Sequence, residues 1–348
     1  MNTHNFILIN GRFLSQQMTG VHRYAYEICC AIHSLGVHIK VLAPDKVLPQ
    51  YQCPFEVINI GGTGSHWWEQ ITLPRYVKKH YKGNRLLSLT GLSPISYQHN
   101  ILTIHDVSYL VEPKWFSKTY YYLYKFLTPI AARKAEKIIT VSEFSKRELI
   151  KYLHLPEHKI HIVHCGVRQW EKATGKIDDT YILSVCSMDP RKNLKRLLDA
   201  FLEADISHNL YLAGGTYAAF ADNDMQRYRQ NDNIVFLGYV GDERLQTLYH
   251  SATAFVNVSL YEGFGIPNIE AMQQGTPLLL SDIPVYHEIC GDAALYVNPN
   301  DTASISAGIR QIVEDPLLRA RLTGEGDKQY QQFNWRSSAQ RIIELYEQ

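Results

Sequence analysis

Short apolar runs alternate with amphipathic, helix-like stretches along the whole chain of 348 residues. Each run is short enough for a buried strand, and strands that alternate with helices form mainly parallel sheets. The alternation therefore predicts an α/β fold in both halves of the chain. The predicted strands are 6–10, 37–43, 85–89, 100–104, 137–141 and 160–163 in the first half, and 181–186, 209–213, 233–237, 254–258, 277–280 and 294–297 in the second.

The length indicates two domains, because single hydrophobic cores rarely grow past about 250 to 300 residues. A polar stretch with loop composition, 166–180, follows the last strand of the first half. The predicted Rossmann-like domains are residues 1–166 and 167–333. Residues 334–348 are predicted to form a C-terminal helix that packs back toward the first domain.

Charge is unevenly distributed. Residues 1–165 carry 19 Lys and Arg against 10 Asp and Glu, whereas the rest carries 16 against 24. A basic half suits an anionic membrane, a phosphate-bearing substrate or nucleic acid, and the acidic second half argues against nucleic acid. Within 114–137, cations alternate with aromatic residues. This composition fits an interfacial helix on anionic lipid, nucleic-acid stacking, or a helix that packs its aromatics into its own domain.

The six cysteines show no CxxC pair and no zinc spacing, which indicates a reducing compartment. No apolar segment reaches the roughly 18 residues of a membrane span, and the first residues lack the features of a signal peptide. We therefore expect a cytoplasmic protein whose contact with the inner face of the cytoplasmic membrane is at most peripheral.

The most informative loop follows the predicted strand 254–258. It reads Glu262-Gly-Phe-Gly-Ile-Pro267 and leads into a helix that carries Glu270. Glycines let backbone amides approach a ligand closely, and a helix N-terminus offers unpaired N–H groups to an anion. We therefore expect a diphosphate at this turn, flanked by two carboxylates that suit sugar hydroxyls.

This loop resembles the signature of retaining glycosyltransferases of the GT-B architecture, glycosyltransferase family 4, in which a Glu and a second Glu are separated by seven residues. Glu262 and Glu270 match both positions. The resemblance covers nearly the whole chain and implies two Rossmann-like domains that face each other across a cleft. Further matches are Thr19-Gly20, His105-Asp106, Val141-Ser142-Glu-Phe-Ser145, Pro190-Arg191-Lys192-Asn193, Ala213-Gly214-Gly215 and Leu237-Gly238-Tyr-Val240.

The resemblance also implies roles for individual residues. Glu262 would contact the donor sugar, Glu270 the ribose, and Arg191 with Lys192 the leaving diphosphate. The family often has a Gly-Arg pair where this chain has Val185-Cys186, so Arg191 is expected to supply that charge. The implied catalytic residues are His105, Arg191, Lys192 and Glu262, and the implied donor-binding residues are Gly20, Tyr239, Val240, Gly263, Phe264, Gly265, Ile266 and Glu270.

The function implied is transfer of a hexose from a nucleotide diphosphate sugar to a hydroxyl of a lipid-linked or growing surface glycan, with retained anomeric configuration. GDP-mannose is the first choice of donor, ahead of UDP-hexoses and deoxyhexose nucleotides. No side chain stands out as a covalent nucleophile, which favours same-face attack. No metal or other cofactor is expected. The alternatives are a sugar-nucleotide hydrolase or epimerase of the same fold, and a non-catalytic sugar-nucleotide-binding scaffold.

Three further motifs bear on this hypothesis. Asp222-Asn-Asp224 has the form of a DxD metal site, but its polar loop context predicts a turn. Gly61-Gly-Thr-Gly64 is not GxGxxG, so a dinucleotide fingerprint is excluded. His66-Trp-Trp-Glu69 is an aromatic cluster that suits either an acceptor pocket or a core.

Overall fold

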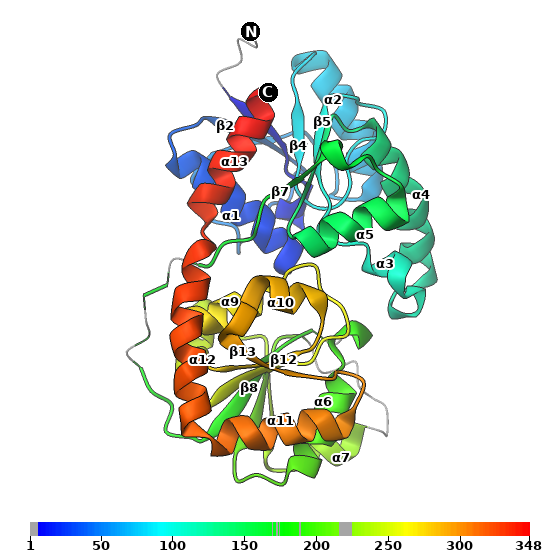
Figure 1. Ribbon diagram of the computed structural model, residues 1–348. Helices are drawn as coiled ribbons and strands as arrows, with labels where there is room; N and C mark the ends of the chain where they lie inside the picture. The colour runs from blue at the N-terminus through cyan, green and yellow to red at the C-terminus, as the bar shows by residue number, and fades with distance from the viewer. Residues whose placement is uncertain (1–5, 169, 172, 174, 188, 216–224) are drawn as a thin grey trace. The chain divides into compact units, whose positions relative to one another are not determined.

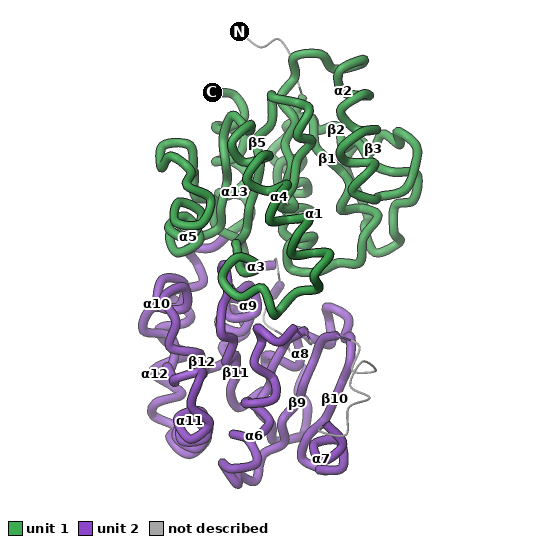
Figure 2. The backbone as a smooth tube through the Cα atoms, turned by 90° about the vertical axis from the view of Figure 1, so that its right-hand side faces the viewer, with its two compact units in different colours: residues 1–166, 334–348 green, residues 167–333 purple. Residues whose placement is uncertain are grey.

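The structure is a computed structural model that describes residues 6–168, 170–171, 173, 175–187, 189–215 and 225–348. The chain divides into two compact units, which Figure 2 shows in different colours. Unit 1 comprises residues 1–166 and 334–348, and unit 2 comprises 167–333. Within the part of the chain that the structure describes, no helix has the length and apolar character needed to cross a membrane.

Unit 1 contains a seven-stranded parallel sheet in the order β3-β2-β1-β4-β5-β6-β7. The strand order changes direction between β1 and β4, and ligands of such sheets bind beyond the carboxyl ends of the strands at this switch point. The strands are β1 (Ile7–Asn10), β2 (Ile39–Ala43), β3 (Glu56–Asn59), β4 (Leu86–Ser88), β5 (Asn100–Thr103), β6 (Lys137–Thr140) and β7 (Ile160–Ile162).

Helices cover both faces of this sheet: α1 and α13 lie against one, and α2, α4 and α5 against the other (Figure 1). On the second face, Leu8 of β1 and Leu86 of β4 stand opposite each other and pack with Val77 of α2. The helices are η1 (Arg12–Ser15), α1 (Gly20–Ser34), η2 (Trp68–Thr72), α2 (Leu73–His80), α3 (Ser108–Val111), η3 (Pro113–Trp115), α4 (Lys118–Lys134), α5 (Glu143–Leu153), η4 (Glu157–Lys159) and α13 (Trp335–Glu347).

Helix α13 follows unit 2 in the chain but packs in unit 1. Its Trp335 ring meets the Tyr24 ring of α1 edge to face, with centroids 5.7 Å apart. At the other end of the helix, the Tyr346 hydroxyl donates to the Arg85 carbonyl at 2.6 Å. A Cβ on Gly166 would lie 2.3 Å from the Trp335 backbone nitrogen, so only glycine lets the chain pass this close to α13.

Unit 2 contains a six-stranded parallel sheet in the order β10-β9-β8-β11-β12-β13, which changes direction between β8 and β11. The strands are β8 (Tyr181–Val185), β9 (Asn209–Ala213), β10 (Ile234–Gly238), β11 (Ala254–Asn257), β12 (Leu278–Ser281) and β13 (Ala294–Val297). The helices are η5 (Pro190–Lys192), α6 (Leu194–Ala204), α7 (Gln226–Arg229), α8 (Asp242–Ser251), α9 (Ile266–Gln273), α10 (Pro284–Cys290), η8 (Gly291–Ala293), α11 (Thr302–Glu314), α12 (Pro316–Gln329) and η9 (Tyr330–Gln332).

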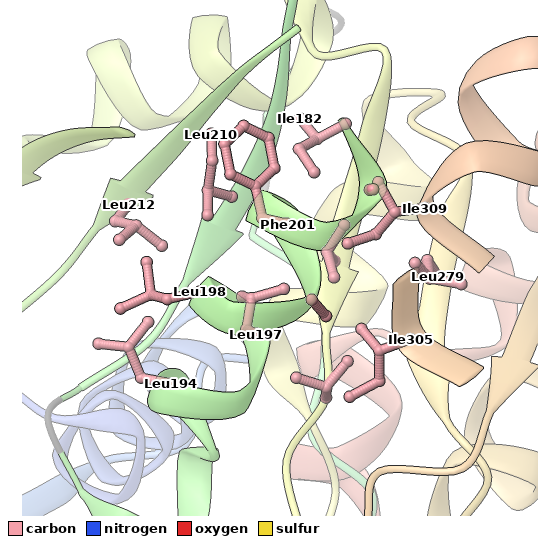
Figure 3. Close-up of a cluster of buried hydrophobic side chains, with 14 of the residues drawn as sticks. Ile182, Leu194, Leu197, Leu198, Phe201, Leu210, Leu212, Leu279, Ile305 and Ile309 are labelled. Carbon is pink, nitrogen blue, oxygen red and sulfur yellow. The ribbon is translucent and has the colours of Figure 1, made fainter. Parts of the chain in front are cut away.

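The core of unit 2 forms where α6 and α11 meet one face of the sheet. Figure 3 shows Leu197 and Phe201 of α6 beside Ile305 and Ile309 of α11, with Leu210 of β9 in the same cluster. Leu197 and Phe201 are four positions apart, which places them on one side of α6. The core thereby fixes the sheet whose carboxyl edge carries the site described below.

Every predicted strand is present, and the sequence missed one. Strand β3, Glu56–Asn59, lies at the edge of the unit 1 sheet, where both terminal residues are exposed and the two central residues are half-buried. A strand that buries so little requires no apolar run. Its apolar residues Phe55, Val57, Ile58 and Ile60 are interrupted by Glu56 and Asn59, and the prediction did not use them.

Candidate functional site

The loop between β11 and α9 is a tight, glycine-dependent turn in unit 2. Gly265 precedes the helix with φ of 99°, a conformation that favours glycine. A Cβ at this position would lie 2.8 Å from the Asn268 Nδ2 atom. Pro267 stands in the first turn of α9, where its missing N–H costs no helical hydrogen bond. The sequence therefore brings backbone amides and a helix N-terminus to one point at the carboxyl edge of the sheet.

Glu262 lies buried in this loop between two cations. Its Oε2 is 3.3 Å from Arg191 Nη1, and its Oε1 pairs with the Lys192 ammonium and lies 3.2 Å from Ser259 Oγ. Burial disfavours the charged carboxylate, but Lys192 and Arg191 outweigh it and hold the pKa of Glu262 below its usual value. Glu262 comes from one predicted motif, and Arg191 and Lys192 come from another. In the structure the three residues form one ionised cluster.

The two cations are held in place by the backbone around them. The Leu260 N–H donates to the Arg191 carbonyl at 2.8 Å. Asn193, which follows η5 in a left-handed conformation, donates from Nδ2 to the Val258 carbonyl at 3.0 Å. These bonds join the segment after β8 to the segment after β11, so the positions of Arg191 and Lys192 are fixed by the fold of unit 2.

Glu270 of α9 lies buried, and both of its oxygens have partners inside unit 2. Oε1 is 2.8 Å from Arg168 Nε, and the Tyr249 hydroxyl donates to Oε2 at 3.1 Å. Arg168 also pairs with Asp242 at 2.7 Å and lies 4.5 Å above the Trp170 ring. The resemblance predicts that Glu270 contacts the ribose, and in the structure Arg168 and Tyr249 set the orientation of its carboxylate.

The other predicted donor-binding residues of unit 2 follow β10 and β11, and their side chains are exposed to different degrees. Tyr239 follows β10 with its side chain largely exposed, and Val240 next to it is buried. The Phe264 ring is buried and packs edge to face on Phe333, with centroids 5.4 Å apart. Phe264 therefore offers a ligand its backbone, as do Gly263 and Gly265. Ile266 begins α9 and is partly exposed.

His105 follows β5 in unit 1 and is neutral. Its Nε2 donates to the Leu89 carbonyl at 2.9 Å, so Nδ1 remains an acceptor. Burial lowers the pKa of His105. Asp106, whose role the sequence left open, accepts from the Ser108 N–H at 2.9 Å and from its hydroxyl at 2.6 Å, and so holds the turn that begins α3.

Gly20, the remaining predicted residue, is the exposed first residue of α1. His22, two residues further on, was missed by the sequence. Its Nε2 donates to Gln16 Oε1 at 2.9 Å, while Nδ1 lies 2.8 Å from the Thr19 hydroxyl. Burial, with Arg12 and His105 nearby, lowers the pKa of His22 to about 4, so it is neutral at pH 7. The one available signal was its position three residues after Thr19, a residue type that often caps a helix.

A buried polar cluster lies at the switch point of the unit 1 sheet. Glu69 is completely buried in the π-helical turn η2, where it accepts from Asn10 Nδ2 at 2.8 Å. Arg12 Nη1 and His66 Nδ1 lie 3.7 and 3.6 Å from its other oxygen. Trp68 is also buried, so the second half of the His66–Glu69 motif belongs to the core.

Of the two remaining motifs, the structure describes Gly61-Gly-Thr-Gly64. Gly61 accepts a hydrogen bond from the Trp68 indole at 2.7 Å, as part of an ordinary loop. Asp222 and Asp224 lie outside the described residues.

Comparison with known proteins covers both units. Residues 167–329 match the family described as Glycosyl transferases group 1, and residues 18–169 match Glycosyltransferase Family 4. The O-antigen chain mannosyltransferase RfbU of Salmonella typhimurium is 32% identical over 326 residues, or 89% of this chain and 92% of that protein. The O-antigen chain mannosyltransferase B of Escherichia coli is 32% identical over 73% of this chain and 71% of its own length.

Among solved structures, the fold is similar to that of WaaG, a glycosyltransferase involved in lipopolysaccharide biosynthesis. The TM-score is 0.76 at 14% sequence identity, over 98% of this chain and 99% of the other.

Proposed function

The chain belongs to the group 1 glycosyltransferases and has the GT-B fold, and on that premise we propose that it transfers mannose from GDP-mannose with retention of the anomeric configuration. Two O-antigen chain mannosyltransferases among its relatives support mannose as the sugar. The proposed acceptor is a hydroxyl of a lipid-linked or growing surface glycan. That acceptor brings the protein to the inner face of the cytoplasmic membrane.

The ionised cluster of Glu262, Arg191 and Lys192 is the observation that carries this proposal. Negative charge develops on the departing diphosphate, and preorganised cations stabilise that charge most strongly when water is excluded. Both cations are largely buried and lie in the same cluster as a carboxylate suited to sugar hydroxyls. We propose that these cations and the N-terminus of α9 serve the diphosphate without a metal ion.

A panel of sugar nucleotides tests the choice of donor. A ligand that binds the folded state raises the melting temperature, and we expect GDP-mannose to stabilise the protein more than UDP-glucose, UDP-galactose or a GDP-deoxyhexose.

With a lipid-linked glycan acceptor, NMR of the product should show the donor's anomeric configuration, and EDTA should leave the rate unchanged. An inverted product, or loss of the rate in EDTA that magnesium restores, would contradict the corresponding part of the proposal. GDP release at equal rate without acceptor would instead indicate a hydrolase.

Glu270→Gln is expected to raise the KM for the donor roughly tenfold to a hundredfold. This ratio corresponds to the free energy lost with one hydrogen bond to a charged group. The kcat should change little, because a ribose contact is present in both the ground state and the transition state. Arg168→Met should act in the same direction, since it removes the cation that orients Glu270. Steady-state kinetics over a range of donor concentrations separate the two constants.

Arg227→Met is the matched control, because Arg227 pairs with Asp199 on an exposed part of unit 2. If Glu270→Gln leaves the donor KM at the parent value, then Glu270 is not the ribose contact.

A further inference from the structure

A series of buried, uncharged polar side chains leads from α9 to Glu262. Asn257, at the end of β11, donates from Nδ2 to the Asn268 Oδ1 atom of α9 at 2.9 Å. The Ser259 hydroxyl lies 2.7 Å from the Asn257 Oδ1 atom and 3.2 Å from the Glu262 Oε1 atom. Asn268 and Ser259 are completely buried, and Asn257 is 6% exposed. Asn257 and Asn268, here called the amide pair, therefore connect two elements of unit 2 to the hydroxyl beside Glu262.

The orientation of the Asn257 amide follows from its partners. Its Nδ2 faces the Asn268 oxygen, so its Oδ1 faces Ser259, whose N–H also points at this oxygen from 3.4 Å. A hydroxyl has one proton, and the two oxygens beside Ser259 Oγ, those of Asn257 and Glu262, are both acceptors. The proton can therefore serve Glu262 in the absence of a ligand, and can turn to Asn257 when a ligand hydroxyl donates to Glu262.

Asn268 also packs against the glycine turn of the candidate site. A Cβ on Gly265 would lie 2.8 Å from Asn268 Nδ2 and 3.0 Å from Tyr286 Cε1, so both side chains lie against Gly265. The Asn268 N–H donates to the Gly265 carbonyl at 2.9 Å. The amide pair thus touches the turn proposed for the diphosphate at one end and the hydroxyl beside Glu262 at the other.

Packing alone does not account for two buried amides. A buried polar group lowers stability unless it is hydrogen-bonded, and an apolar pair of similar shape can fill the same space at little or no cost. The neighbours of the pair in sequence, Val256 and Ile269, are apolar and completely buried. Hydrogen bonds between buried polar groups restrict those groups to one arrangement. The arrangement fixed in this case is that of Ser259 beside Glu262.

We propose that Ser259, supported by the amide pair, is a positioning residue that orients the Glu262 carboxylate toward the hexose of the donor. The inference rests on the proposed function, in which Glu262 contacts that sugar. A group that contacts a substrate must be held within about 0.5 Å of its productive position. The Lys192 ammonium is a point charge on a flexible stem, so it sets the direction of the carboxylate less strictly than a hydroxyl held by the fold.

Ser259→Ala tests the proposal through a comparison of GDP-mannose with GDP. The variant removes one hydroxyl and should leave the fold intact. It should lower kcat/KM for GDP-mannose at least about tenfold, as expected for the loss of a hydrogen bond to a charged group. The dissociation constant of GDP, which has no hexose, should remain that of the parent. Steady-state kinetics with a glycan acceptor and calorimetric titration with GDP measure the two quantities.

The double variant Asn257→Leu with Asn268→Leu tests the support of Ser259. It replaces both amides together, so neither is left facing an apolar partner, and such a paired change can be nearly neutral for stability. A loss of kcat/KM for GDP-mannose with unchanged GDP affinity is expected again. Ser306→Ala is the matched control, because Ser306 is an equally buried serine of unit 2, in α11. It should keep both parent values.

Three results would overturn the proposal: a parent value of kcat/KM in Ser259→Ala, full activity of the double variant, or a loss of kcat/KM that an equal loss of GDP affinity accompanies. The last result would mean that these side chains only hold the fold of the turn. A parent that does not turn over GDP-mannose contradicts the proposed donor instead. The comparison is then made between the sugar nucleotide that stabilises the parent most and its own nucleotide, so the role of Ser259 is tested in either case.

Discussion

Lys192→Ala is expected to lower kcat by about a hundredfold to a thousandfold, the usual loss when one preorganised electrostatic donor is removed. Charge builds on the diphosphate as the glycosidic bond breaks, so a cation directed at it acts mainly in the transition state. The KM for the donor should rise much less. Steady-state kinetics together with a separate measurement of donor affinity distinguish the two effects.

The surroundings of Lys192 make this variant informative, because its loss does not leave a buried charge alone. Glu262 keeps Arg191 Nη1 at 3.3 Å and Ser259 Oγ at 3.2 Å after the ammonium is removed. The variant should therefore remain folded and retain measurable donor binding.

Lys195→Ala is the control for Lys192→Ala. Lys195 lies three positions further along the chain, and its side chain is exposed on α6. Its removal should leave both constants near the parent values. If Lys192→Ala turns over like the parent, then the diphosphate is stabilised elsewhere and the proposed role of the cluster is wrong.

Trp335→Ala is expected to lower the free energy of unfolding by about 3 to 5 kcal/mol, the usual cost of truncating a large buried aromatic side chain. Trp335 is buried at the start of α13 and packs on Tyr24. Domains of this kind have a total stability of about 5 to 15 kcal/mol, so the loss is a large fraction of it. Urea denaturation followed by circular dichroism measures the difference.

Arg336→Ala provides the matched control, because Arg336 is the next residue of α13 and its side chain is exposed. We expect a change within about 0.5 kcal/mol for this surface position. An equal effect of the two substitutions would mean that α13 contributes to unit 1 through its helical backbone and charge rather than through the buried ring.

The strands of both sheets could be predicted because each central strand buries nearly all of its residues, as in Ile7–Asn10 and Leu278–Ser281. Such strands need continuous apolar runs, which are visible in the sequence. Strand β3 lies at the edge of its sheet, and its two apolar residues, Val57 and Ile58, stand between Glu56 and Asn59, which makes its apolar run shorter than those of these central strands.

In the candidate site, the residues that the sequence predicted belong to one local turn, whereas a residue that it missed makes a contact distant in sequence. Glu262, Gly265 and Pro267 belong to one turn whose geometry demands particular residue types at fixed spacing. Arg168 has no such local requirement. It contacts Glu270 more than a hundred residues later, and that contact exists only when the segment after Gly166 lies against α9. A single sequence holds no signal for a pairing of this kind.

For α4 the sequence left several interpretations open, and burial shows which side of the helix faces the sheet. The aromatic residues alone do not show which side of the helix faces the sheet. Because the small residues Ala131 and Ala132 take that side, Phe126 is left facing outward.

The discontinuity of unit 1 has a consequence for the order in which the protein is made. A ribosome delivers residues 1–166 first and all of unit 2 next, and only then α13. Unit 2 is a single continuous stretch, so it can complete its core before Trp335 has been synthesised. Until then, the contacts of Trp335 with Tyr24 and Gly166 of unit 1 are missing. Domains generally fold from the N-terminus onward during synthesis. In this chain the unit whose synthesis begins first is the last to be completed.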